Sequence, residues 1–191
     1  RVTGISNSKK MFFNDEGIDL TKWKELLQSG EEMKMTDFIS IIQKKNLRNS
    51  VFIDITANAE VAKTYTHFLE KSISVVACNK IACSSAYEYY KKLKDLAREF
   101  NALFLFETNV GAGLPVIGTL NDLLRSGDKV NRIEAVLSGT LNFVFNNYTG
   151  EKSFASVVKQ AQEEGYTEPD PRLDLSGTDV MRKIMILARE T

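Results

Sequence analysis

A stretch near the C-terminus gathers charged residues in a pattern that suits substrate binding and proton transfer. Its carboxylates are Glu168, Asp170, Asp174 and Asp179, and Lys183 follows the last of them by four residues. That spacing puts Asp179 and Lys183 on the same face of a helix. Carboxylates bind a cationic group such as a substrate amine, and a lysine acts as acid or base where neighbours and burial tune it. The stretch therefore predicts an amine-binding site in which Lys183 handles a proton.

Two other interpretations fit the same residues. A helix beginning around residues 177–178 with an exposed Asp179–Lys183 ion pair would contribute only about 0.3–0.5 kcal/mol and carry no chemistry. A carboxylate cluster also suits Mg²⁺, although no phosphate-binding residues lie nearby in the sequence. Pro169 and Pro171 restrict their own φ angles and the residues before them, which predicts a stiff, extended loop between residues 165 and 177.

Three other segments follow predicted strands and contain residues that suit a ligand. Lys80 ends an apolar run and is predicted to point into a crevice, although lysines commonly mark strand ends. The glycine-rich turn at residues 110–115 either presents carbonyls to a cation or lets a strand and a helix approach closely. Ser8 and Lys9 follow the first predicted strand, where dinucleotide-binding folds place an acidic residue for NAD or a basic one for NADP. Lysine at this place favours NADP.

The elements that must position these residues alternate along the chain. Short β-branched or aromatic runs predict strands at residues 2–6, 51–56, 73–77, 103–107 and 133–137. Amphipathic stretches predict helices at residues 61–69, 84–100, 114–125, 153–164 and 177–187. This order is typical of βαβ units in a mostly parallel sheet. Such a sheet binds ligands beyond the carboxyl ends of its strands, which is where the polar segments lie.

The predicted fold class is α/β in two parts. Residues 1–114 form a Rossmann-like, NAD(P)-binding domain, with two helices at 21–28 and 36–45 inserted after the first strand. All three prolines lie from residue 115 onward, so residues 115–191 are assigned to a second domain. No G-x-G-x-x-G turn stands between a strand and a helix. The first strand of the sheet, with that turn, is therefore expected to precede Arg1.

Composition excludes several classes of function. Lys+Arg and Asp+Glu both number 25, so the net charge is zero and neither nucleic acid nor an anionic membrane is an expected partner. His67 is the single histidine, which excludes multi-histidine metal sites. The two cysteines, Cys78 and Cys83, are too few for a disulfide framework and indicate reduced thiols in a cytoplasmic protein.

These residues together resemble the homoserine dehydrogenase family. Its signature is similar to the run Ala161-x-x-x-Gly165-Tyr166-Thr167-x-x-Asp170-Pro171-x-x-Asp174-Leu175-x-Gly177-x-Asp179-x-x-x-Lys183. Supporting resemblances are Asp54-Ile-Thr-Ala, Asn79-Lys80, Thr108-Asn-Val-Gly-Ala-Gly-Leu-Pro115 and Leu137-Ser-Gly-Thr. The first strand and the insertion after it resemble the homoserine dehydrogenase part of bifunctional aspartokinase–homoserine dehydrogenases.

The resemblance implies NAD(P)-dependent interconversion of L-homoserine and L-aspartate 4-semialdehyde, on the route to threonine and methionine. It implies that Lys183 donates or accepts the proton at the C4 oxygen. Homoserine would be held by the carboxylates of Glu168, Asp174 and Asp179, with help from the Thr140 backbone. The small-molecule substrate would then lie beside the second domain.

For the cofactor, the resemblance implies that Lys80 lies between nicotinamide and substrate and that Thr56 touches the dinucleotide. Ser8 and Lys9 would lie near the adenosine ribose of NADP, or of NAD. A sodium or potassium ion would be held by backbone carbonyls at Glu107, Val110, Ala112 and Leu114.

The resemblance also carries expectations about the whole protein. The chain is expected to be an internal fragment, lacking the first βα unit of one domain and the end of an α+β substrate and dimerisation domain. Its parent is expected to be a homodimer or higher homo-oligomer fused to an aspartokinase. The competing interpretations are another NADP-dependent reductase of small amino or keto acids, and a regulatory or dimerisation fragment without catalysis.

Overall fold

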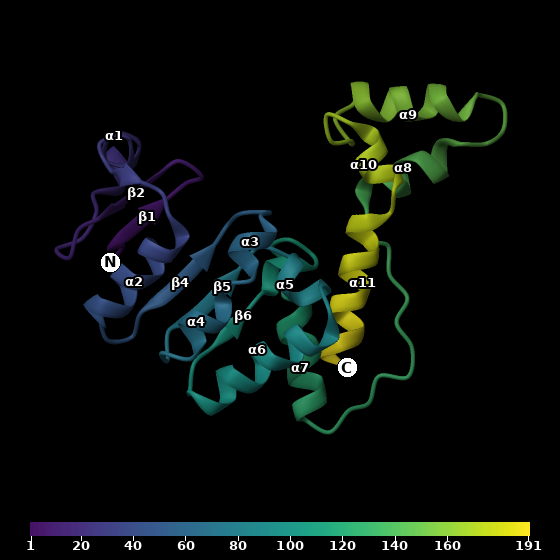
Figure 1. Ribbon diagram of the computed structural model, residues 1–191. Coiled ribbons are helices and arrows are strands. Elements are labelled where there is room, and N and C mark those ends of the chain that lie inside the picture. The colour runs from purple at the N-terminus through teal and green to yellow at the C-terminus, as the bar shows by residue number, and fades with distance from the viewer.

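A three-stranded parallel sheet lies at the centre of the computed structural model, which describes residues 1–191 (Figure 1). Its order is β4 (Val51–Asp54), β5 (Ser74–Ala77) and β6 (Phe104–Leu105). Val51 pairs with Ser74 and Asp54 with Ala77, so both strands end at the same edge. Three of the five predicted strands are therefore confirmed as members of the parallel sheet. The third is shorter than expected, because a 3-10 turn, η2 (Glu107–Asn109), begins directly after it.

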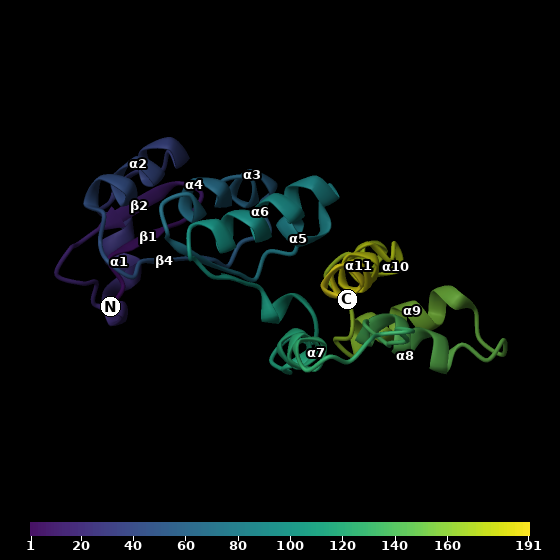
Figure 2. The same cartoon turned by 90° about the horizontal axis from the view of Figure 1, so that it is seen from below.

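The helices that join these strands cover one face of the sheet, as Figure 2 shows. They are α3 (Ala59–Ala62), α4 (Tyr65–Leu69), α5 (Ile81–Ser84) and α6 (Tyr87–Glu99). The side chains of Tyr65 and Phe68 on α4 and of Leu93 on α6 are fully buried. The helix predicted at 61–69 is interrupted after Ala62, and α5 was not predicted. On the other face, Ile53 and Leu105 are 59% and 48% exposed, so this side of the sheet is uncovered.

Residues 2–6 do not join the parallel sheet, contrary to the prediction. β1 (Gly4–Ser6) pairs antiparallel with β2 (Lys10–Phe13), which pairs with β3 (Glu31–Glu32). The reason is a tight turn in which the Asn7 side chain accepts hydrogen bonds from the backbone of Lys9 and Lys10, at 2.8 Å each. The turn returns the chain against β1 before any helix can form.

The rest of the N-terminal segment confirms the predicted insertion of two helices. A 3-10 turn, η1 (Leu20–Lys22), leads into α1 (Trp23–Gln28), and α2 (Met35–Lys45) follows β3. Aromatic rings connect the insertion to the central sheet. Phe38 of α2 lies 5.1 Å from Phe13 and 6.2 Å from Phe52 of β4, measured between ring centroids.

The regular structure between residues 116 and 191 is all helix, with no strand. The helices are α7 (Val116–Arg125), α8 (Gly139–Asn147), α9 (Phe154–Glu163), α10 (Pro171–Leu175) and α11 (Thr178–Glu190). The strand predicted at 133–137 is wrong, because the segment is extended but pairs with no other strand. The extended loop predicted at 165–177 is also wrong in part. Pro171 occupies the first turn of α10 and Asp170 caps it, so the proline starts a helix here.

The second part thus shows the helical portion of the predicted domain, with α8 as an unpredicted helix that Ser138 caps. A small core of Val144, Val157 and Ala161 joins α8 to α9. Helix α11 runs from this helical group back to the sheet domain, where Ile186 and Leu187 enter the main core (Figure 1). No helix in the structure combines the length and apolar character needed to cross a membrane.

Candidate active site

Helix α11 brings its first charged residues to the junction between the two parts of the chain. Lys183 Nζ lies 2.6 Å from Asp179 Oδ2, which confirms that the four-residue spacing places them on one face. Lys183 also donates to the Leu137 carbonyl at 2.7 Å. Its side chain is 20% exposed. Two of the three N–H bonds of the lysine are therefore directed by the protein, and the third is available to a ligand.

Lys80 reaches the same carboxylate from the other part of the chain. It stands where β5 leads into α5, and its Nζ lies 3.3 Å from Asp179 Oδ1. Lys80 thus stands at the strand end, as predicted, but it does not line the groove beside β4, and its crevice stays a prediction. One carboxylate thus holds a lysine from each part, so Lys80, Asp179 and Lys183 form one cluster.

The loop that carries Lys80 is fixed by a buried network that the sequence did not reveal. The Asn79 side chain donates to Asp54 Oδ2 at 3.1 Å and to the Asn58 carbonyl at 2.9 Å. Asp54 also accepts from Tyr65 Oη at 2.5 Å and from the Thr56 backbone N–H at 2.7 Å. Asp54 is 1% exposed, so these donors replace its water. The sequence signal that could have indicated this network was the pair of short runs, around Asp54 and Asn79, that resemble the family.

The two lysines determine the charge state of Asp179. Its partial burial acts to raise the pKa, but the hydrogen bond from Lys183 and the charges of both lysines outweigh it. The net result is a pKa of Asp179 below the ordinary aspartate value. Asp179 is therefore an anion at neutral pH and keeps both lysines at the junction.

The remaining predicted substrate residues meet beside α8 and α10. Asp174 Oδ1 accepts from the Thr140 hydroxyl at 3.0 Å, and Asp174 Oδ2 accepts from the Glu168 backbone N–H at 2.9 Å. The Thr140 side chain also contacts the Tyr166 carbonyl at 2.5 Å. Asp174 thus braces the loop that carries Glu168, whereas the Glu168 carboxylate has no partner in the structure.

The residues predicted to bind cofactor lie in two places. Ser8 and Thr56 line one groove of about 1160 Å³ between β1 and the open edge of β4. Lys9 is exposed beside its mouth, on the turn that Asn7 holds. Lys80 lies outside this groove, at the cluster with Asp179. The groove therefore brings Ser8, predicted to lie near the ribose, together with Thr56, predicted to touch the dinucleotide. Lys80 instead lies beside Asp179, one of the residues predicted to bind substrate.

The predicted cation site fits in part. The carbonyls of Val110 and Ala112 accept no hydrogen bond, and Gly111 and Ala112 have φ angles of 83° and 52° that turn this loop sharply. The Leu114 carbonyl instead accepts from the Val116 N–H at 2.9 Å, and the Glu107 carbonyl accepts from the Val110 N–H at 3.4 Å. The Glu107 side chain accepts from the backbone N–H groups of Ile117 and Gly118, at 2.8 and 2.7 Å, and so caps α7. Two carbonyls are free for a cation. The structure contains no group of three or more His, Cys, Asp or Glu side chains arranged for a metal ion.

Comparison with known proteins adds to this geometry. A profile of the family described as "Homoserine dehydrogenase, NAD binding domain" matches residues 2–107, and one described as "Homoserine dehydrogenase" matches residues 115–191. The bifunctional aspartokinase/homoserine dehydrogenase 2, chloroplastic, of Arabidopsis thaliana is 49% identical over 193 residues, covering 100% of this chain. The homoserine dehydrogenase of Schizosaccharomyces pombe is 39% identical over 177 residues, covering 90% of this chain and 47% of the relative.

Among solved structures, a hyperthermophilic archaeal homoserine dehydrogenase in complex with NADPH is similar to 96% of this chain and 58% of that chain. Its TM-score is 0.77 and its sequence identity 28%. The chain spans 21% of the length of the Arabidopsis relative. The two family profiles together cover nearly every residue, and the second one spans the signature run around Lys183. The chain belongs to the homoserine dehydrogenase family.

Proposed function

We propose that this chain is the central part of an enzyme that interconverts L-homoserine and L-aspartate 4-semialdehyde with NADP as cofactor. The observation that carries the proposal is the Lys80–Asp179–Lys183 cluster, because it joins the part matched by the NAD-binding profile to the part matched by the second profile. A bound nicotinamide supplies hydride transfer at C4 of the substrate. The chain's own residues then have to move one proton and hold the substrate.

Lys183 is the residue assigned to the proton. Its third N–H direction is free, since Asp179 and the Leu137 carbonyl take the other two. In the reductive direction the Lys183 ammonium donates this proton to the oxygen on C4. In the oxidative direction Lys183 accepts the hydroxyl proton. Asp179 orients the lysine and balances its charge, and Lys80 comes to the cluster from the part matched by the NAD-binding profile.

Glu168 is assigned to the substrate amine. Its carboxylate is exposed and unpaired, while both oxygens of Asp174 are engaged by Thr140 and by the Glu168 backbone. Asp174 therefore acts on the amine mainly by holding the Glu168 loop in place. This division of roles predicts that Glu168→Gln raises the KM for homoserine more than it lowers kcat.

The preference for NADP rests on Ser8 and Lys9. A lysine with an unpaired ammonium beside the groove can neutralise a 2′-phosphate, as basic residues do in NADP-binding folds. Lys9→Glu should therefore raise the KM for NADP and leave the KM for NAD nearly unchanged. The open edge of β4 and the groove beside it also leave room for a further strand with a phosphate-binding turn.

Sodium or potassium at the Val110 and Ala112 carbonyls is a further part of the proposal. Activity in sodium, potassium and tetramethylammonium salts tests it.

The proposal extends to assembly. The Arabidopsis and Zea mays relatives are named as bifunctional aspartokinase/homoserine dehydrogenases, which supports fusion of this segment to an aspartokinase. We propose that the protein is a homodimer or higher homo-oligomer in the cytoplasm. Its substrate is a small molecule, and it binds neither nucleic acid nor membranes. Light scattering of the full-length protein measures the assembly directly.

The decisive experiment measures NADP reduction with homoserine in the full-length protein and in Lys183→Met. Removal of a general acid–base typically lowers the rate by about 10²–10⁴-fold, so we expect that loss in kcat. Lys183→Arg is the matched variant, since it keeps the charge but cannot exchange a proton near neutral pH, and it should also lose activity. Full turnover by Lys183→Met would exclude the lysine role, and turnover of another amino or keto acid in place of homoserine would exclude the substrate.

A further inference from the structure

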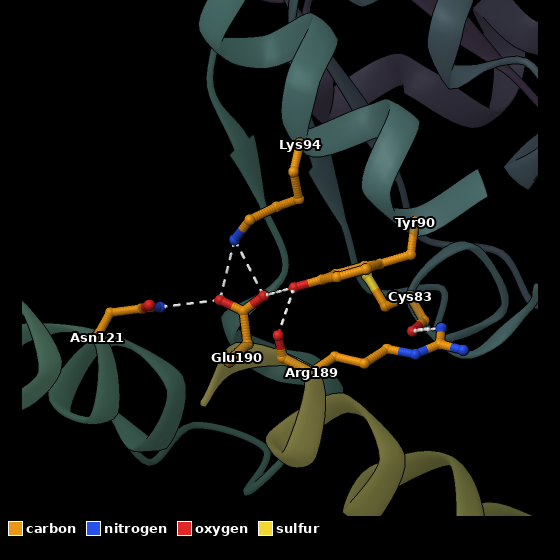
Figure 3. Close-up of polar contacts among 6 residues, drawn as sticks. All are labelled: Cys83, Tyr90, Lys94, Asn121, Arg189 and Glu190. Atoms are coloured by element: carbon orange, nitrogen blue, oxygen red, sulfur yellow. Dashed lines mark hydrogen bonds and ion pairs between the residues drawn. The ribbon is translucent and has the colours of Figure 1, made fainter. Parts of the chain in front are cut away.

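The last turn of α11 contains a second charged cluster, about two helical turns beyond Lys183. The Glu190 side chain is 1% exposed although it is a carboxylate. Both of its oxygens lie 3.0 Å from Lys94 Nζ, and Asn121 donates to it at 3.1 Å. Tyr90 Oη donates to the same carboxylate. Figure 3 shows these three side chains arriving from α6 and α7 around the end of α11.

The neighbouring Arg189 attaches the same turn to α5. Its guanidinium donates to the Cys83 carbonyl at 2.6 Å and to the Ser85 carbonyl at 2.7 Å. It also lies over the Tyr90 ring, 5.4 Å from the centroid, where a cation is attracted by the ring face (Figure 3). Two consecutive residues of α11 therefore bind three helices, α5 and α6 of the sheet domain and α7.

This arrangement controls orientation in a way that apolar contacts do not. Ile186 and Leu187 hold α11 against the core, but apolar contacts are non-directional and allow a helix to turn or slide. Replacing a buried ion pair with apolar residues is often neutral or stabilising, so stability alone does not explain a buried Glu190. Hydrogen bonds to a carboxylate fix its direction, and with it the rotation of the helix.

The distance along α11 from Glu190 to the proposed active site is short. Lys183 precedes Glu190 by seven residues, which is about 10 Å along a helix at 1.5 Å per residue. A tilt of about 10° at Glu190 would shift Lys183 by about 2 Å on that length. Displacements of about 1 Å at a reacting group can cost about 10²-fold in rate. The position of Lys183 is thus sensitive to the position of Glu190.

We propose that Glu190 and Lys94 form a positioning pair that sets the orientation of α11, so that Asp179 and Lys183 meet Lys80 at the junction. This inference rests on the proposed function for its kinetic consequence. Neither residue touches substrate or cofactor. The pair acts through the helix, with Tyr90, Asn121 and Arg189 completing the anchor.

The test compares three variants of the full-length protein. Lys94→Met removes the cation and leaves the buried carboxylate uncompensated, Lys94→Arg keeps the charge, and Lys159→Met removes an exposed lysine that lies 3.8 Å from Glu163 on α9. We expect Lys94→Met to lower kcat by about 10- to 100-fold while the KM for NADP stays within about twofold. Lys94→Arg should recover most of the activity, and Lys159→Met should match the unmodified protein.

A second readout separates this inference from the proposed function. Amide hydrogen exchange in α11 should be faster in Lys94→Met than in the unmodified protein, with α9 unchanged, whether or not homoserine is the substrate. Lack of homoserine oxidation by the unmodified protein would contradict the proposed function alone. Unchanged kcat together with unchanged exchange in Lys94→Met would overturn the positioning pair, as would a loss of stability with full kcat in the folded protein. If Lys94→Met does not fold, Glu190→Gln is measured by the same criteria.

Discussion

The two ends of α11 carry carboxylates in opposite environments. Asp179, in the first turn, is 52% exposed and is contacted by Lys80 and Lys183 alone. Glu190, in the last turn, is 1% exposed and receives Lys94, Tyr90 and Asn121. The first cluster leaves lysine N–H directions free, and the second leaves its carboxylate fully satisfied.

The difference shows how one helix can serve chemistry at one end and orientation at the other. A group that must exchange protons with a ligand needs unoccupied hydrogen-bonding capacity and access from solvent. A group that must keep its place needs every lone pair engaged, because an unpaired buried charge is costly. The tyrosine in the second cluster supports this, since burial, and after it the hydrogen bond to Glu190, raises the pKa of Tyr90 and keeps it a neutral donor.

The largest effect expected from this comparison is on stability. Lys94→Ala should lower the free energy of unfolding by about 3–5 kcal/mol, because it leaves Glu190 as a buried, uncompensated charge. Lys80→Ala, the equivalent change at the other end, should cost less than about 1 kcal/mol, since Asp179 stays half exposed and keeps Lys183. Urea unfolding followed by circular dichroism measures both. Equal losses in the two variants would contradict the distinction between the ends.

What the sequence could predict depends on how far apart the partners are. Asp179 and Lys183 were predicted together because a four-residue spacing defines a helix face without further information. Lys80 was predicted because strand ends of a parallel sheet share one edge. Glu190 was not predicted, since its partners Asn121 and Tyr90 lie 69 and 100 residues away and only packing brings them there.

The fold errors have a similar cause. The run at residues 2–6 was correctly predicted as extended, but its pairing was decided by the Asn7 turn and not by its own composition. The run at residues 133–137 has strand-like composition and no neighbour to pair with in the structure. Pro171 was expected to keep the loop at 165–177 extended, although proline is also favoured in the first turn of a helix. Local patterns thus predict the conformation of a segment better than its partner.

A smaller effect distinguishes two buried carboxylates by their partners. Asp54 and Glu190 are both buried, but Asp54 has only neutral donors, among them Tyr65, whereas Glu190 has a lysine. Tyr65→Phe should therefore cost about 1.5–3 kcal/mol of unfolding free energy, the usual loss for a hydrogen bond to a charged group. Tyr90→Phe removes the corresponding hydroxyl from Glu190 but leaves Lys94 on that carboxylate, so the loss of unfolding free energy should be smaller. A double comparison by urea unfolding tests this, and a larger loss in Tyr90→Phe would show that the lysine does not dominate the Glu190 cluster.

The smallest effect concerns pH at the exposed end of α11. The pKa of Asp179 is lower in the folded protein than in an unfolded chain, where aspartate titrates at about 3.9. A lowered carboxyl pKa contributes stability that is fully present above the unfolded value and is lost as the pH falls through the folded value. Because Asp179 is half exposed, solvent screening limits the contribution to about 0.2–1 kcal/mol.

Asp179→Asn should therefore be less stable than the unmodified protein by a constant amount above about pH 5, and the difference should shrink below about pH 4. The difference should also decrease in high salt, which screens exposed charges. Urea unfolding across pH at two salt concentrations measures it. A difference that grows on acidification would mean that Asp179 is held protonated by burial, and the ion cluster could not then orient Lys183. A difference that is insensitive to salt would instead place Asp179 in a buried cluster like that of Glu190, and the contrast between the two ends of the helix would disappear.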